Sequence, residues 1–188
     1  ASLTMGDWRR IMQLKNLEEL HIHTNALAII PDVIGRLENL RRLTLDTDVE
    51  LRWPEEAMPR LSKLEYLKLS GCLGEETPDF VWGYTQLQTL IIEDESVTRP
   101  LQGLENLRRL QELELHLPGL ESWPAEVHGL TGLRRLKVQA ENIRSIEQAA
   151  PQWPVLVELV LHLPQLEQLP DDFFGQTALE KMDLKLGT

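Results

Sequence analysis

The sequence predicts an α/β solenoid, a curved superhelix with a parallel β-sheet on its concave side and short helical or 3₁₀ segments on its convex side. Three observations predict this fold. The pattern L-x-x-L-x-L recurs at a nearly constant interval, and an apolar residue followed by proline comes after several of the copies. The hydrophobic share of the 188 residues is 42%, which is ordinary for a globular protein and sufficient for a continuous core.

The repeat divides the chain into units of nearly equal length. The pattern begins at eight positions: Leu17, Leu40, Leu64, Leu87, Leu110, Leu133, Leu156 and Leu179. Successive starts are 23 residues apart, except for one step of 24 between Leu40 and Leu64. A fixed period of this length indicates stacked repeats, because no single unit can bury its leucines alone. We therefore expect residues 17–188 to form a solenoid of about eight units.

Within each unit the order of elements is strand, turn and short helical segment. The L-x-L part alternates apolar and polar residues, as a strand with one buried face does. The apolar-proline step follows, as at Ile30, Trp53, Trp123 and Leu169. Proline suits the first position of a helical turn, because its missing N–H has no partner there. We expect Trp53 and Trp123 to occupy core positions.

The two ends of the chain differ from the middle. The segment "DWRRIMQLKN" lines up with the second half of a unit, so residues 1–16 are expected to form an N-terminal helical cap or a partial repeat, and Trp8, Ile11 and Leu14 are expected to belong to that cap. The last unit stops after its strand. Because solenoids need polar caps, we expect this strand to be followed by further sequence or covered by a partner.

These features resemble the leucine-rich repeat family. The stretch "LEELHIHTNALAIIPDVIGRL" matches nearly every anchor of the repeat L-x-x-L-x-L-x-x-N-x-L-x-x-L-P-x-x-I-x-x-L, and the resemblance extends from Leu17 to the C-terminus. The units are similar to those of plant intracellular leucine-rich repeat proteins and of the repeat domains of bacterial type III effectors. The resemblance implies a curved solenoid that recognises other proteins.

The position of the family's asparagine, which satisfies backbone groups of the turn, departs from the consensus. That column reads Asn25, Asp48, Cys72, Glu95, Pro118, Glu141 and Pro164. Only the first unit keeps the asparagine. We expect irregular turns in the fourth and sixth units, where Glu95 and Glu141 stand, and a buried structural thiol at Cys72.

The outward side chains of the strands are the candidate partner-binding surface. In the frame L-x-x-L-x-L-x-x, the third, fifth, seventh and eighth places are expected to face outward on the concave side. The residues predicted to bind a partner there are His21, His23, Tyr66, Ile91, Glu93, Glu114, His116, Val160 and His162. Exposed apolar groups rimmed by polar ones are typical of protein contacts.

The charges on this surface have two interpretations. From Glu112 onward the third-place column alternates in sign through Arg135, Glu158 and Lys181. Such alternation favours cross-strand ion pairs, which form either a charged recognition surface or an internally satisfied ladder. We expect an acidic module of this kind to prefer a partner with a basic patch, near Glu93, Asp94, Glu112 and Glu114.

Four of the five histidines lie on the expected strands, but a metal site is not predicted. His116 and His162 are two strands apart, roughly 9.6 Å, which is too far to share one zinc ion. We expect no metal and no cofactor. Because histidine titrates near neutral pH, the affinity for a partner is expected to depend on pH.

Composition excludes several classes of function. The net charge of −11 argues against nucleic acid, and no stretch reaches the 18 or more apolar residues of a membrane span. The start lacks the features of a signal peptide. The single cysteine cannot form an internal disulfide, which favours an intracellular, cytoplasmic location, including that of a bacterial protein delivered into a host cytoplasm.

No motif for catalysis is present. There is no glycine-rich phosphate loop, no G-x-S-x-G, no H-E-x-x-H and no paired C-x-x-C. The sequence therefore predicts a non-catalytic module for protein–protein recognition on the concave sheet. Two alternatives stay open: the substrate-recognition domain of a larger enzyme, such as a bacterial effector E3 ubiquitin ligase, and the sensor region of an immune receptor. The sequence predicts no particular oligomeric state.

Overall fold

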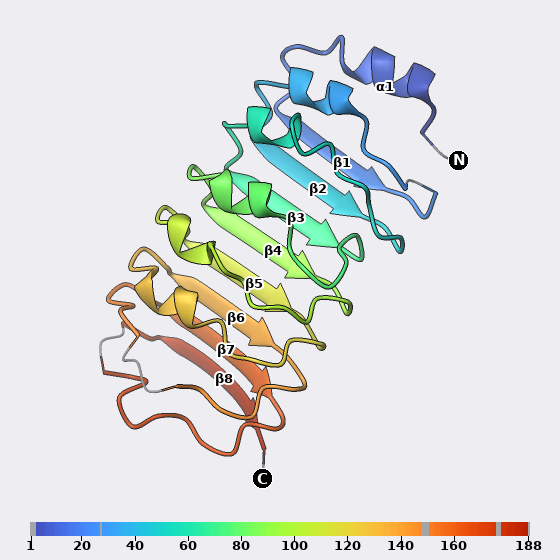
Figure 1. The fold of residues 1–188 in the computed structure, drawn as a ribbon. Helices are drawn as coiled ribbons and strands as arrows, with labels where there is room; N and C mark the ends of the chain where they lie inside the picture. Colours follow the sequence, from blue (N-terminus) through green and yellow to red (C-terminus); the bar gives the residue numbers. More distant parts are fainter. Residues whose placement is uncertain (1–2, 27, 148–150, 176–177, 188) are drawn as a thin grey trace.

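The computed structural model describes residues 3–26, 28–147, 151–175 and 178–187. Within these residues one eight-stranded parallel sheet runs in chain order from β1 to β8, with the two ends of the chain at opposite ends of the solenoid (Figure 1). The strands are β1 Glu19–His23, β2 Arg42–Asp46, β3 Tyr66–Ser70, β4 Thr89–Glu93, β5 Glu112–His116, β6 Arg135–Gln139, β7 Glu158–Leu163 and β8 Lys181–Leu186. The predicted parallel solenoid is confirmed.

Each strand pairs with the next at equivalent positions of the repeat. Glu112 on β5 lies opposite Arg135 on β6, and Arg135 lies opposite Glu158 on β7. The step of 24 residues does not disturb this register, because Arg42 still pairs with Tyr66. Side chains at one place of the repeat therefore form columns across the sheet, about 4.8 Å apart.

The inward leucines form a core that continues from unit to unit. Leu90, Leu113 and Leu136 stand at the same place on neighbouring strands, and each is 0% exposed. Their neighbours in the column, Leu67 and Leu159, are equally buried. Each unit thus completes the burial of the unit beside it, as the spacing of the leucines predicts.

Short 3₁₀ helices cover the side of the core opposite the sheet (Figure 1). Within the described residues they are η1 Asp32–Arg36, η2 Met58–Arg60, η3 Asp79–Gly83, η4 Leu104–Asn106 and η5 Ala125–Gly129. Pro31 and Pro78 stand one position before η1 and η3, in extended backbone, and their carbonyls accept the first hydrogen bonds. Proline therefore precedes these helices and does not occupy their first position.

An α-helix, α1 (Met5–Ile11), packs beside η1 at the first end of the solenoid. Thr4 and Asp7 form a capping box at its start. Trp8 is 1% exposed and Ile11 packs against the core, whereas Leu14 is 53% exposed and lies outside it. The assignment of residues 1–16 to a cap stays a prediction.

The eighth place of the repeat faces inward, so its predicted outward direction is wrong. Thr47 and Asp94 occupy this place and are each 4% exposed. Their side chains accept hydrogen bonds from the backbone N–H groups two residues later, of Val49 and Ser96, at 3.2 and 2.9 Å. Asp94 also accepts one from the N–H of Leu73 at 2.8 Å. These residues perform in the turn the task that the family's asparagine performs.

The ninth place, where the asparagine column was expected, faces solvent in most units. Glu95 and Glu141 are exposed there, and the fourth and sixth turns bend at the same places as the first two turns, so the expected irregularity is not found. The third unit is the exception. Gly71 takes the eighth place with φ at +60°, and a Cβ on it would lie 2.1 Å from the carbonyl oxygen of Thr47. In this turn Cys72, at the ninth place, points inward at 0% exposure.

Candidate functional site

The strand face is the surface formed by the third, fifth and seventh places of the eight units. It holds 24 side chains, the first, third and fifth residues of each strand. Seven of them are carboxylates, Glu19, Asp46, Glu93, Glu112, Glu114, Glu158 and Asp183, and six are cations, Arg42, Lys68, Arg135, Lys137, Lys181 and Lys185. Although the whole chain carries a net charge of −11, the strand face is close to neutral.

Ion pairs between neighbouring strands satisfy most of these charges. Arg135 on β6 pairs with Glu112 on β5 and, from its Nε at 3.0 Å, with Glu158 on β7. The hydrogen bond to Glu112 is the main reason why the pKa of Arg135 is raised above its ordinary value. Glu112, Arg135 and Glu158 of the alternating column thus satisfy one another, as the structural one of its two interpretations expects. Exposed pairs of this kind contribute at most about 1 kcal/mol each.

The carboxylates expected to attract a basic partner are engaged within the chain. Glu93 lies 2.8 Å from the Nζ of Lys68, and Glu114 lies 3.6 Å from that of Lys137. Glu112 pairs with Arg135, and Asp94 is buried in a turn. Asp94 is therefore not part of an accessible patch, because its carboxylate serves the backbone.

The predicted apolar anchors are half-buried and separated from one another. The ring of Tyr66 lies under the guanidinium of Arg42, 4.0 Å from its carbon. Ile91 stands between Lys68 and Glu114 in the fifth-place column. Val160 stands three strands further on, between Lys137 and Asp183. They do not form one apolar patch, because a charged residue stands on each side of Ile91 and of Val160.

The histidines fall into two groups on the strand face. His21 and His23 lie on β1 with parallel rings, 6.5 Å between centroids, and contact Glu19 at 2.9 Å and Asp46 at 3.0 Å. His116 and His162 lie on β5 and β7, four or more strands away. The nine predicted residues are therefore not brought to one place.

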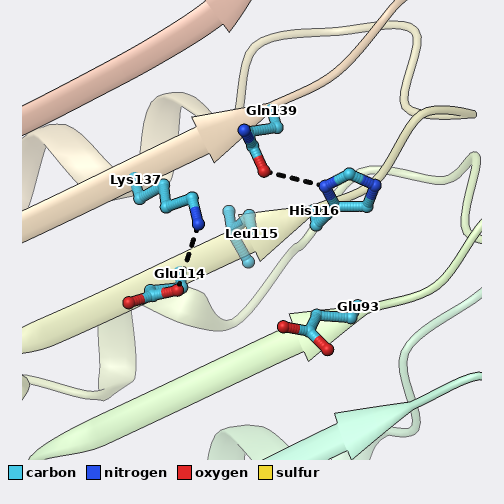
Figure 2. A pocket seen from close by; sticks show the side chains of 6 residues that line it. All are labelled: Glu93, Glu114, Leu115, His116, Lys137 and Gln139. Carbon is cyan, nitrogen blue, oxygen red and sulfur yellow. Dashed lines mark hydrogen bonds and ion pairs between the residues drawn. The ribbon is translucent and has the colours of Figure 1, made fainter. Parts of the chain in front are cut away.

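Three of the predicted residues do meet in an open hollow over β4, β5 and β6. Glu93, Glu114 and His116 line it together with Leu115, Lys137 and Gln139, as Figure 2 shows. Leu115 forms the floor at 1% exposure. The prediction missed Lys137 and Gln139 as lining residues, although the register places Gln139 directly beside His116.

A chain of hydrogen bonds runs from His116 and Gln139, which line this hollow, to two further side chains, His162 and Asp183. His116 Nδ1 lies 2.8 Å from Gln139 Oε1, which Figure 2 marks with a dashed line. Gln139 Nε2 lies 2.7 Å from His162 Nδ1, and His162 Nε2 lies 3.0 Å from Asp183 Oδ2. His116, Gln139 and His162 occupy the seventh place of three successive strands.

The comparisons with known proteins agree with this geometry. No protein-family model and no curated protein matches the sequence. Among solved structures, the leucine-rich repeat domain of the type III effector XopL is 23% identical, with a TM-score of 0.77 over 95% of this chain. The chain has the leucine-rich repeat fold.

Other leucine-rich repeat structures are similar over most of the chain. The plant peptide hormone receptor RGFR1, in complex with RGF2, is 23% identical with a TM-score of 0.69 over 94% of this chain. An internalin, inlF of Listeria monocytogenes, is 21% identical with a TM-score of 0.60 over 82%. The chain spans 63% of the length of the XopL chain, 29% of RGFR1 and 51% of inlF.

The thiol of this leucine-rich repeat chain lies in the core. Cys72 is fully buried, and burial, with a smaller effect of nearby Asp94, raises the pKa of its thiol to about 12. This thiol is protonated at neutral pH and is not a nucleophile. In the part of the chain that the structure describes, no cluster of three or more His, Cys, Asp or Glu side chains could hold a metal ion.

The helices of the leucine-rich repeat chain are short. Among the described residues, none has the length and the apolar character that crossing a membrane requires.

Proposed function

We propose that this chain is a non-catalytic protein-recognition module that binds a protein partner on its strand face. The observation that carries this proposal is the hollow lined by Glu93, Glu114, His116, Lys137 and Gln139, which lies near the middle of a continuous surface of 24 side chains. Hydrogen-bond donors, acceptors and both signs of charge converge there. A partner segment can satisfy them without displacing the core.

The similar structures support this proposal at the level of fold. RGFR1 is a peptide hormone receptor whose structure was determined in complex with RGF2. Repeat solenoids in general bind partners on extended surfaces built from equivalent positions of successive repeats. The strand face of this chain is such a surface.

The near neutrality of the strand face refines the expected partner. Excess negative charge lies on the turns and the 3₁₀ side, so a basic partner is attracted to the molecule as a whole. At the strand face the partner has to complement a mixture of paired charges, amides and imidazoles. We propose a partner that is basic overall and whose contact surface is polar and mixed.

The second candidate is the substrate-recognition part of a larger enzyme, for which the similarity to a type III effector domain is the supporting observation. In that case catalysis resides outside the 188 residues, and the chain acts inside a host cell. An intracellular location is part of this proposal.

The test compares partner binding by the wild type and by a variant of the hollow, His116→Ala with Gln139→Ala. The matched control carries Glu105→Ala and Asn106→Ala, two exposed residues of η4 on the side opposite the sheet. Partners are captured, identified by quantitative mass spectrometry, purified and titrated by calorimetry. We expect the hollow variant to lose at least tenfold in affinity and the control to stay within twofold. Equal affinities for all three proteins would refute binding at the hollow.

A further inference from the structure

The hydrogen-bond chain on the strand face fixes which ring nitrogens carry protons. The amide Nε2 of Gln139 can only donate, so the Nδ1 of His162, 2.7 Å away, has to accept. His162 is therefore neutral in this arrangement, with its proton on Nε2, which donates to Asp183. At the other side, Oε1 of Gln139 can only accept, so Nδ1 of His116 carries a proton.

This arrangement accommodates a proton on His116 but not on His162. His116 already donates from Nδ1, and a second proton on its Nε2 leaves the hydrogen bond to Gln139 intact. A proton on Nδ1 of His162, by contrast, would place two donors against each other. Rotating the amide of Gln139 by half a turn removes that conflict, because Oε1 then faces His162.

After this rotation His116, and no longer His162, is the ring that cannot carry a second proton without a conflict. Nε2 of Gln139 then faces Nδ1 of His116, which has to accept and is neutral, with its proton on Nε2. No orientation of the amide accepts from both rings. When both histidines are charged, one hydrogen bond is lost and two donors oppose each other.

We propose that Gln139 couples the protonation of His116 and of His162 negatively, so that the second proton binds to this row of the strand face only at lower pH than it would to two separate histidines. The orientation of the Gln139 amide also determines whether Nε2 of His116 accepts or donates a hydrogen bond in the hollow. Nε2 of a neutral His116 is an acceptor in the first orientation and a donor in the second. A proton on His162 therefore inverts the hydrogen-bonding character of the candidate binding site two strands away.

Several charged groups lie around the two rings. His162 is faced by Asp183 and Lys185 on β8 and by Glu141 after β6. The charged or titratable groups that line a hollow together with His116 are Glu93 on β4, Glu114 on β5, Lys137 on β6, the turn carboxylates Asp48, Asp94, Glu95 and Glu141, and His162 and Lys185. Within the described residues, Gln139 alone hydrogen-bonds to Nδ1 of either ring. The coupling between the two rings therefore depends on the amide of Gln139.

The experiment follows each ring nitrogen of the full chain by two-bond ¹H–¹⁵N NMR between pH 4.5 and 8.5, in wild type and in Gln139→Val. Valine suits a strand and removes the amide. In the variant we expect the second proton to bind about one pH unit higher than in wild type, the shift that corresponds to one hydrogen bond. His23, which pairs with Asp46 on the far end of the sheet, should titrate identically in both proteins.

A second variant, Gln165→Val, makes the same change at an exposed glutamine outside the row, where Gln165 accepts from Arg144. It should leave His116 and His162 as in wild type. Titration curves of the two rings that coincide between wild type and Gln139→Val would overturn the proposal. No partner is needed for this readout, so its outcome is independent of whether the strand face binds a protein.

Discussion

Lowering the pH should destabilise the fold through His128, a buried histidine on the side opposite the sheet. The indole N–H of Trp123 donates to His128 Nε2 at 2.7 Å, so the ring is neutral, with its proton on Nδ1. His128 is 7% exposed and lies edge-on to Trp153, with 5.8 Å between ring centroids. Burial lowers its pKa, and the nearby Asp172 opposes this only in part.

The sign of the effect follows from the lowered pKa. The unfolded chain binds a proton at His128 near pH 6.5, whereas the folded chain binds it only at lower pH. The contribution of His128 is therefore fully present above about pH 6.5. It is lost as the pH falls from there towards the folded pKa, with a slope of at most about 1.4 kcal/mol per pH unit for one proton.

The assay is urea unfolding followed by tryptophan fluorescence at pH 8, 7, 6 and 5.5, for wild type and His128→Gln. Glutamine keeps an acceptor for the Trp123 N–H but does not titrate. We expect the difference in unfolding free energy between the two proteins to be constant from pH 8 to 7. Below pH 6.5 this difference should shrink, because only the wild type loses stability through protonation at position 128. The other histidines are present in both proteins, so their contributions cancel in this difference. A difference that stays constant down to pH 5.5 would refute the argument.

Other substitutions test the core, the turns and the thiol. Leu113→Ala should cost about 2 to 5 kcal/mol of unfolding free energy, because the leucine is fully buried; a urea-measured loss below 1 kcal/mol would contradict the shared core. Gly71→Ala should lower the melting temperature by several degrees, since its φ is +60° and its Cβ would meet the carbonyl of Thr47. Gly129→Ala, with nothing within 4 Å of its Cβ, is the control and should change it little. Cys72 should react with a thiol reagent only as fast as the fold opens; rapid reaction in buffer at pH 7.5 would disagree with its burial and its raised pKa.

The spacing of the leucines predicted most of the fold, because the strand register of a parallel solenoid is set by the length of its repeat. The interval fixes which residues stand side by side, so the columns through Glu112 and through His116 follow from the sequence alone. The direction in which the side chain at the eighth place points could not be predicted in this way. It depends on how the turn closes, and Thr47 and Asp94 show that a hydroxyl or carboxylate there takes over from asparagine.

The candidate site was less predictable than the fold. Columns show which side chains are neighbours, but not which of them pair. Glu93 looked available in the sequence and is bound to Lys68 on the preceding strand. The chain from His116 to Asp183 depends on rotamers and on a diagonal contact between β7 and β8. A repeat pattern contains no information on either.

The strand face is nearly neutral, whereas the whole chain has a net charge of −11. An encounter with a basic protein would therefore have two stages that depend on different charges. Attraction at a distance comes from carboxylates that the bound partner does not touch, and it fades as counter-ions accumulate. Retention comes from short contacts that counter-ions hardly reach. Added salt should thus slow the arrival of such a partner while leaving its residence time almost unaltered.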